Sequence, residues 1–508
     1  MKRRIGVDLG LKSTHKVVVV EESGIASRPT SIDVSLEGFL KLRDLAFNGS
    51  DRCATHVVME PTGNVWLPLA AFLMAEGVPV VISNPRKVSD FRKVLRRYVK
   101  TDVVDADAMA RLTQVDPKRS HVFEMPSVDV LSLRRVVKER DRFVRDATAR
   151  KLRIGSAMQL ANPRLMGCFG EEKFSTTARV MFRDFVDPFS VVRLGEKRFT
   201  QRLRQKGGRA PAEQVHEILA ACEKTCALYS EMLRRKALPF NYELMAREIG
   251  MELAAMEFAE AQVKVLDESI KELYGRVDPA QTLRLIPGMG DIIAAAIEAF
   301  SSPIDRFHNA KAYASYCGLV PRMSQTGTAP HDHSHHITKC GNRLLKKYFH
   351  LAAEISRQQD PDLAAYYAAK SAAGWHHGRI ITAIAHKLVR RVYALLQRRE
   401  NDALRPNGDR QPQVYNLRVP DGNIVDREAA KAYVKEHYPS KREQARRAAE
   451  RAKSKRDASQ LGNKGQPKGS TNRVKRDHVP HATVHHEHPV IQPANTIATA
   501  VQNPVENA

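Results

Sequence analysis

The chain has 508 residues, enough for about three domains of ordinary size. Its 82 Lys and Arg residues outnumber its 57 Asp and Glu residues, and the formal net charge of +25 favours a polyanionic partner such as nucleic acid. The longest apolar stretches, residues 67–82 and 292–300, contain Glu76 and Glu298 and fall short of the ~18 uninterrupted apolar residues of a membrane span. Asp8 occupies the place where a signal peptide would be apolar. We therefore expect an intracellular, cytoplasmic protein with no membrane partner.

The first 120 residues alternate strand and helix signals. Apolar, β-branched runs predict strands at 4–9, 16–21, 25–34, 55–59 and 78–82. Amphipathic spacing predicts helices at 39–45, 65–75, 85–98 and 102–114. Three consecutive strands followed by alternating helices and strands indicate an α/β domain, with a mixed sheet covered by helices, over residues 1–120.

The rest of the chain divides into three further regions. Residues 121–279 have a long, charged helical pattern, which indicates a helical spacer or a dimerising coiled coil. Residues 280–400 open with a Gly/Pro turn and continue as apolar helices, which predicts a second, mainly α domain. Residues 401–508 lose hydrophobicity, and we expect a basic, largely disordered tail because residues 439–508 contain no aromatic side chain. Residues 441–476 carry 13 Lys and Arg against 3 Asp and Glu.

Four acidic residues in the first domain are candidate metal ligands. Asp8 and Glu60 each close an apolar strand, where a carboxylate is costly unless it is paired, at the sheet edge or bound to a cation. Asp102 and Asp105 are three residues apart and share one helix face, whereas Asp107 faces away. Together the four acids suit two hard divalent cations that hold a phosphate. Taken singly, a strand-end Asp also fits a turn, and Asp102 also fits a helix cap.

Basic residues flank these acids and recur in the second domain. Residues 86–100 contain seven Lys and Arg against one acid. In the second domain, the turn Ile286–Gly290 resembles a helix-hairpin-helix turn, whose glycine N–H groups can approach a phosphate. The residues that we expect to contact nucleic acid are Arg92, Lys93, Arg96, Arg97, Lys100, Gly288, Gly290, Arg322, Lys339, Arg343, Lys346 and Lys347.

The order of motifs in the first domain resembles a known family. The segments VDLG at 7–10, VVMEPTGNVW at 57–66, and NP at 84–85 followed by KTDVVDADAMA at 100–110 are similar to the RuvC-like (ribonuclease-H-fold) domain of DEDD transposases of the insertion-sequence one-ten group, the bridge-RNA-guided recombinases. The resemblance implies that Asp8, Glu60, Asp102 and Asp105 are the catalytic, metal-binding tetrad. It also implies Mg²⁺ as the ion, in a two-metal site.

The second domain resembles the other signature region of the same transposases, through YCGLVPR at 316–322, QTGT at 325–328 and HITKCGNRLL at 336–345. In that family a serine before a glycine attacks DNA and forms a phosphoserine link. Here Thr326 precedes the matching Gly327, and Ser324 lies two positions earlier. We expect Thr326 to be the nucleophile, with Ser324 as the runner-up. The alternative that neither hydroxyl reacts and that this transposase copy is inactive stays open. QTGT is closer to the eleven-eleven subgroup.

The resemblance implies a transposase, a site-specific DNA recombinase of a mobile insertion element that works at nucleoid DNA. It also implies a structured noncoding guide RNA and a homodimer or homotetramer. Two alternatives stay open: a RuvC-like, metal-dependent, structure-specific nuclease that uses water as its nucleophile, and a non-enzymatic nucleic-acid-binding protein. An actin-like kinase also begins with a strand-Asp-Leu-Gly loop, but this sequence lacks the second phosphate loop that such a kinase needs.

Overall fold

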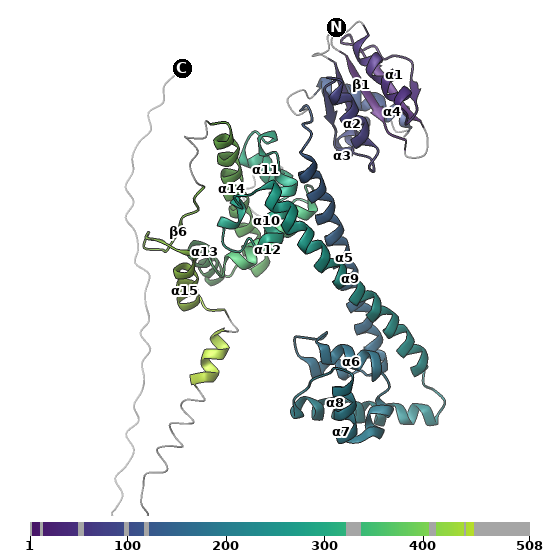
Figure 1. Cartoon of the computed structure of the whole chain (residues 1–508), viewed down its shortest axis with the longest axis vertical. Coiled ribbons are helices and arrows are strands. Elements are labelled where there is room, and N and C mark those ends of the chain that lie inside the picture. The colour runs from purple at the N-terminus through teal and green to yellow at the C-terminus, as the bar shows by residue number, and fades with distance from the viewer. Residues whose placement is uncertain are drawn as a thin grey trace, which may run out of the picture. The chain divides into compact units, whose positions relative to one another are not determined.

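A computed structural model describes residues 3–10, 14–48, 55–95, 101–115, 121–321, 337–405, 413–440 and 443–451 (Figure 1). The chain divides into two compact units, residues 1–440 and 441–508. The elements named below belong to the first unit. In the second unit, residues 443–451 are helical.

A five-stranded mixed sheet forms the centre of the N-terminal domain within the described residues, in the order β3-β2-β1-β4-β5. β1 runs antiparallel to β2 and parallel to β4, β2 is antiparallel to β3, and β4 is parallel to β5. The strands are β1 (Arg4–Asp8), β2 (His15–Val20), β3 (Thr30–Ile32), β4 (His56–Met59) and β5 (Val80–Ile82). This mixed sheet confirms the predicted α/β domain and is consistent with a ribonuclease-H-like fold.

Helices cover both faces of this sheet. α1 (Leu36–Phe47) and α2 (Trp66–Ala75) pack on the face that holds Ile5 and Val57. α3 (Pro85–Val94) and α4 (Asp102–Val115) pack on the opposite face. α1 begins earlier than predicted because the Ser35 hydroxyl accepts a hydrogen bond from the Gly38 N–H and so caps the helix.

Two long helices, α5 (Val128–Ala161) and α9 (Tyr242–Val277), pair along their lengths. Ion pairs join them from one end to the other, including Arg150 with Glu252 at 3.0 Å and Arg140 with Asp267. This pair confirms the long helical pattern between the two predicted domains.

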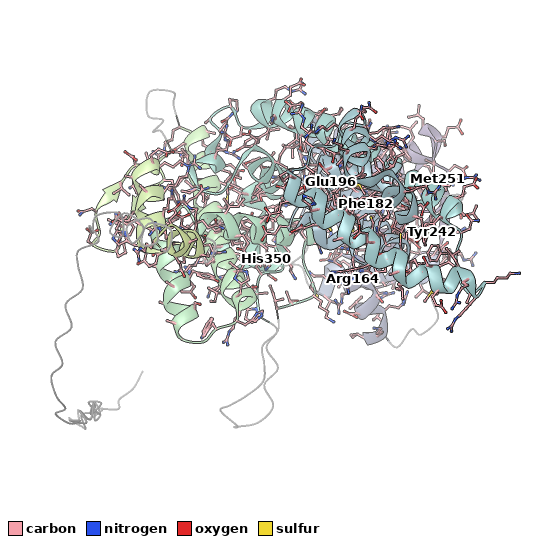
Figure 2. The ribbon with its side chains drawn as sticks, turned by 90° about the horizontal axis from the view of Figure 1, so that it is seen from below. Arg164, Phe182, Glu196, Tyr242, Met251 and His350 are labelled. Atoms are coloured by element: carbon pink, nitrogen blue, oxygen red, sulfur yellow. The ribbon has the colours of Figure 1, made fainter. Side chains whose placement is uncertain are left out.

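The region between α5 and α9 folds around a hydrophobic core of its own, which the sequence did not predict. The core includes Phe182, Phe185 and Phe199, with edge-to-face ring contacts such as Phe185–Phe199 at 5.4 Å (Figure 2, where Phe182 is labelled). The elements are the 3-10 helix Leu165–Phe169, α6 (Thr176–Asp184), α7 (Pro188–Gln205) and α8 (Ala212–Arg234). The spacer is therefore a helix pair with a helical insert.

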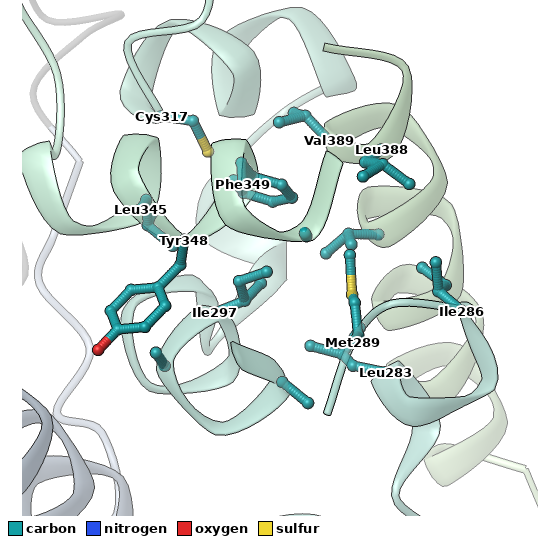
Figure 3. Packing of buried hydrophobic residues seen from close by; sticks show 14 of the residues in the cluster. Leu283, Ile286, Met289, Ile297, Cys317, Leu345, Tyr348, Phe349, Leu388 and Val389 are labelled. Atoms are coloured by element: carbon teal, nitrogen blue, oxygen red, sulfur yellow. The ribbon is translucent and has the colours of Figure 1, made fainter. Parts of the chain in front are cut away.

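The C-terminal domain is helical, as predicted. Its core gathers side chains from the opening turn, including Leu283 and Met289, with Phe349 and Leu388 from later helices (Figure 3). The elements are the 3-10 helices Thr282–Leu285 and Ile304–Arg306, α10 (Asp291–Ser301), α11 (Ala310–Tyr316), α12 (Arg343–Ser356), α13 (Pro361–Ala372) and α14 (His377–Ala403).

The fold continues beyond residue 400, where we had placed the start of the disordered tail, so that boundary was wrong. Residues 413–440 form the hairpin β6 (Leu417–Arg418) and β7 (Ile424–Val425) and the helix α15 (Arg427–His437). Tyr415 anchors the segment, because its hydroxyl bonds to Asp360 at 3.0 Å and Arg391 donates to the same hydroxyl. Within the described parts of the chain, no helix combines the length and hydrophobicity needed to cross a membrane.

Candidate functional site

Asp8 and Glu60 lie at one edge of the N-terminal sheet. Val7 of β1 pairs with Met59 of the parallel strand β4, so the next residue on each strand is one of the two acids. Val7 and Met59 point into the core beneath α1 and α2. Because side chains alternate along a strand, Asp8 and Glu60 belong to the opposite face, where α4 packs. Both side chains are half-buried.

α4 brings the other two acids toward the same edge. The Gln114 side chain, near the end of α4, donates to the Glu21 carbonyl at 3.0 Å, and the neighbouring Val20 pairs with Arg4 at the start of β1. α4 therefore runs antiparallel to β1, and its first turn lies toward the end of β1 that carries Asp8. Asp102 and Asp105 are both in that first turn.

Gly6 sets how closely α4 approaches the sheet. A Cβ added at Gly6 would lie 1.8 Å from the Ala106 carbonyl oxygen and 2.9 Å from the Ala110 amide nitrogen. These distances leave no room for any side chain at position 6. The glycine thus lets the helix backbone lie directly on β1, beside Asp8.

Asp8 and Glu60 lie at one sheet edge and the first turn of α4 is directed toward it, but the described side chains do not form a metal-binding group. Among the described residues, no three His, Cys, Asp or Glu side chains are grouped closely enough to hold a metal ion. Asp105 instead forms an ion pair with Arg92 of α3, and the two side chains are only 13% and 14% exposed. Arg92, which we had predicted to contact nucleic acid, thus neutralises a candidate ligand.

The helix-cap interpretation of Asp102 is wrong. The Thr101 hydroxyl accepts the hydrogen bond from the Val104 N–H at 3.2 Å, which is the N-cap interaction, and Asp102 is exposed in the first turn. Asp107 is buried and forms an ion pair with Arg111 at 2.9 Å. Asp102 is therefore available for a ligand, whereas Asp107 has a structural partner.

The predicted nucleic-acid contacts divide into free and engaged cations. Lys339 and Arg343 are exposed. Lys346 donates to the Thr338 carbonyl at 2.7 Å, and burial lowers the pKa of its ammonium group. Lys347 forms an ion pair with Asp141 of α5. Lys346 therefore stabilises a turn of the C-terminal domain, and Lys347 joins that domain to α5. The sequence alone could not reveal the second contact because Asp141 is 206 residues away from Lys347.

The remaining residues that we predicted to contact nucleic acid or to attack DNA are either exposed, buried or outside the described residues. Lys93 is exposed and lies 3.4 Å from Asp90. Gly288 is buried with a φ of 88°, and a Cβ there would lie 2.6 Å from the Ser356 amide nitrogen, so this glycine serves packing against α12 rather than phosphate contact. Gly290 is exposed at the N-cap of α10. Arg96, Arg97, Lys100, Arg322, Ser324 and Thr326 lie outside the described residues.

Comparisons with known proteins match both domains. A DEDD transposase model of the IS110 type matches residues 5–163, and a model for the transposase IS116/IS110/IS902 family matches residues 280–368. An uncharacterized 44.8 kDa protein of insertion element IS116 from Streptomyces clavuligerus is 24% identical over 395 residues, 77% of this chain and 94% of that protein. An uncharacterized 43.6 kDa protein of insertion element IS110 from Streptomyces coelicolor is 22% identical over 298 residues, 59% of this chain and 71% of that protein.

A mixed sheet with two strand-end acids, in a strongly basic chain, together with these matches indicates a DNA transposase of the DEDD class, an enzyme that acts on nucleic acid. The two family matches and the related insertion-element proteins together support an IS110-family transposase of a mobile insertion element. Transposase domains of this class bind DNA and use divalent metal ions.

Proposed function

We propose that this transposase cuts and rejoins the ends of its insertion element at a site formed by Asp8, Glu60, Asp102 and Asp105. The observation that carries this proposal is the antiparallel course of α4 over β1, which directs the first turn of α4 toward the strand ends that carry Asp8 and Glu60. In this proposal, residues 1–120 supply the four metal-binding carboxylates. The C-terminal domain supplies the hydroxyl group that attacks the DNA phosphate.

The four side chains fit Mg²⁺, because their donor atoms are all carboxylate oxygens, which a hard cation prefers. Two such ions, when bound, would neutralise charge on the scissile phosphate and on the leaving oxygen. Asp105 forms an ion pair with Arg92, and this ion pair must break before the Asp105 carboxylate can bind a metal ion. Arg92 holds this carboxylate in position until then, and its released guanidinium can pair with a DNA phosphate.

We propose Thr326 as the nucleophile, with Ser324 as the runner-up. The hydroxyl oxygen forms a new bond to the DNA phosphorus while the phosphorus–oxygen bond to the neighbouring sugar breaks. The hydroxyl proton is lost to solvent or a base, and the cut strand keeps a free sugar hydroxyl. The resulting phosphoester conserves the bond energy for rejoining, which a water-dependent nuclease would lose.

The exposed cations are proposed to hold the nucleic-acid backbone. These are Lys93, Lys339 and Arg343. Arg96, Arg97, Lys100 and Arg322, which lie outside the described residues, are proposed for the same role. A structured noncoding RNA, which would select the DNA ends and the target, is the proposed second nucleic-acid partner, since the net charge of +25 suits more than one polyanion.

We also propose that two copies pair through an exposed seam on α9. Leu244, Met251, Phe258 and Val265 recur every seven residues and are each at least 60% exposed. Alanines 254 and 261 lie between them and are also exposed. In an antiparallel pair of α9 helices the two central large side chains, Met251 and Phe258, could each face an alanine of the other copy, which favours a second copy of this chain as the partner for the seam.

The experiment for the catalytic proposal is an adduct assay. Purified protein, Mg²⁺ and the RNA that flanks the gene are mixed with labelled DNA carrying the element junction, and protein–DNA adducts are separated after denaturation. Asp8→Asn should reduce the adduct by about 100-fold or more, because several kcal/mol of metal-dependent stabilisation are lost. Thr326→Ala should abolish it, whereas Ser324→Ala should not.

The exposed Asp44→Asn provides a matched charge control, which should retain the full adduct yield. Cut DNA without any adduct, unchanged in both hydroxyl variants, would contradict the covalent mechanism and support the water-dependent nuclease. Loss of the adduct in Ser324→Ala alone would identify Ser324, and not Thr326, as the nucleophile.

A further inference from the structure

The segment that spans most of α13 and α14 contains basic residues but no acidic ones. Residues 363–399 contain seven Lys and Arg residues and no Asp or Glu. Most of this segment lies after residue 368, where the matched C-terminal family model ends. None of the roles proposed above uses its surface residues.

Aromatic rings hold three of these cations in place. The Arg379 guanidinium lies 3.9 Å from the centre of the Trp375 ring, and the Lys370 ammonium lies 4.8 Å from it. The Lys387 ammonium lies 4.5 Å from the centre of the Tyr366 ring, and Lys370 also approaches that ring at 5.9 Å. These five residues are here named the aromatic–cation surface.

The three cations differ from other cations of this segment in having aromatic rather than acidic partners. In the part of the chain that the structure describes, Lys370, Arg379 and Lys387 form no ion pair with a carboxylate. By contrast, Arg391 and Arg399 from the same helix α14 pair with Asp360 and Glu298. A ring orders a cation without neutralising it, so the surface presents fixed positive charges to an anionic partner.

The chemistry of the surface also indicates which anion it fits. Trp375 and Tyr366 are half-buried, whereas Arg379, whose guanidinium lies over the indole, is exposed to solvent. Guanidinium planes and aromatic rings stack on nucleobases, but only unpaired bases have free faces. A duplex would offer the surface only its phosphates.

We propose that the aromatic–cation surface binds unpaired nucleotides of RNA or DNA. Lys370 and Lys387 contact the phosphates, and the Arg379–Trp375 pair stacks on a base. This site is separate from the four acids of the N-terminal domain, and its binding requires neither metal nor strand cleavage.

Tryptophan fluorescence tests the proposal directly, because the chain has two tryptophans, Trp66 and Trp375. The full-length variant Trp66→Phe leaves Trp375 as the single emitter. It is titrated, with a chelator present, with a single-stranded RNA, a DNA of the same sequence and the corresponding duplex DNA. The proposal expects quenching of Trp375 by one or both single strands and little by the duplex, and the two single-strand arms distinguish RNA from DNA as the source of the nucleotides.

A second measurement removes the charges. In the triple variant Lys370→Gln, Arg379→Gln, Lys387→Gln, the salt dependence of single-strand binding should weaken by about 0.7 in log–log slope for each of the two phosphates that the lysines no longer neutralise, about 1.4 in total. The control replaces three exposed lysines elsewhere, Lys224, Lys264 and Lys311, by Gln. Circular dichroism establishes that both variants fold.

Equal quenching by duplex and single strands, absence of quenching, or equal slopes for the two triple variants would overturn the proposal. These outcomes leave the catalytic proposal untouched, because the adduct assay uses different variants and requires metal. Conversely, Asp8→Asn should lose the adduct and retain the Trp375 quenching.

Discussion

At the scale of single residues, the site depends on Gly6 as much as on the acids. We predict that Gly6→Ala destabilises the N-terminal domain by about 1–3 kcal/mol, because its methyl group would overlap the Ala106 carbonyl and push α4 away from β1. Adduct formation should fall strongly although all four carboxylates are intact. Thermal unfolding and the adduct assay measure the two effects.

The control for this substitution is Gly155→Ala in α5, where an added Cβ meets no atom within 4 Å. That change should be neutral or stabilise the helix by up to about 1 kcal/mol. A Gly6→Ala protein with normal stability and normal adduct yield would show that the close approach of α4 is not needed.

Sequence patterns located the acids but not their partners, for a physical reason. A carboxylate that ends an apolar strand is conspicuous in the sequence, because the cost of burying it demands an explanation. The partners of these charges follow only from the fold: Arg92 comes to Asp105 from another helix, and Lys347 comes to Asp141 across 206 residues. The predicted cations Arg92, Lys346 and Lys347 were therefore assigned to nucleic acid before their protein partners were known.

At the scale of elements, hydrophobic periodicity predicted β1, β2, β4 and β5 closely, since each is a short apolar run. The strand predicted at 25–34 is only the three-residue β3, Thr30–Ile32. Periodicity did not reveal the insert between α5 and α9. There the pattern is helical throughout, and only the tertiary packing of residues such as Phe182 and Phe199 shows that α6, α7 and α8 enclose a core. Residues 413–440 were missed because a two-residue hairpin carries almost no periodic signal.

The exposed seam of α9 gives a prediction at this scale. Met251→Glu with Val265→Glu should shift the protein from dimer or tetramer to monomer, because four charges would meet in each pair of helices at positions that are otherwise apolar. Light scattering during size-exclusion chromatography measures the mass. Leu228→Glu on α8, an exposed leucine outside the seam, is the matched control and should leave the mass unchanged. A double variant that keeps the mass of the unaltered protein would place the subunit contact elsewhere.

At the scale of the whole molecule, the first compact unit ends at Ser440, and the basic arm at 441–476 follows it. A chain ending at Ser440 should keep its unfolding temperature, because every contact described for α15 and the β6–β7 hairpin is retained. A chain ending at Arg405 should unfold at least ~5 °C lower. It removes Tyr415 from the buried Asp360–Arg391 pair and uncovers the apolar surface beneath Leu417 and Val434. Differential scanning fluorimetry compares the two with the full chain.

The same pair of truncations separates folding from nucleic-acid affinity. Removing residues 441–508 takes away 13 Lys and Arg from 441–476 against 3 acids, so binding to any DNA should weaken and depend less steeply on salt. The proposed catalytic residues and the aromatic–cation surface all precede Ser440, so adduct formation and Trp375 quenching should persist at low salt. If ending the chain at Ser440 abolished the adduct even at low salt, the tail would contribute to catalysis rather than to general affinity. Competition with unlabelled DNA over a range of salt concentrations decides between these roles.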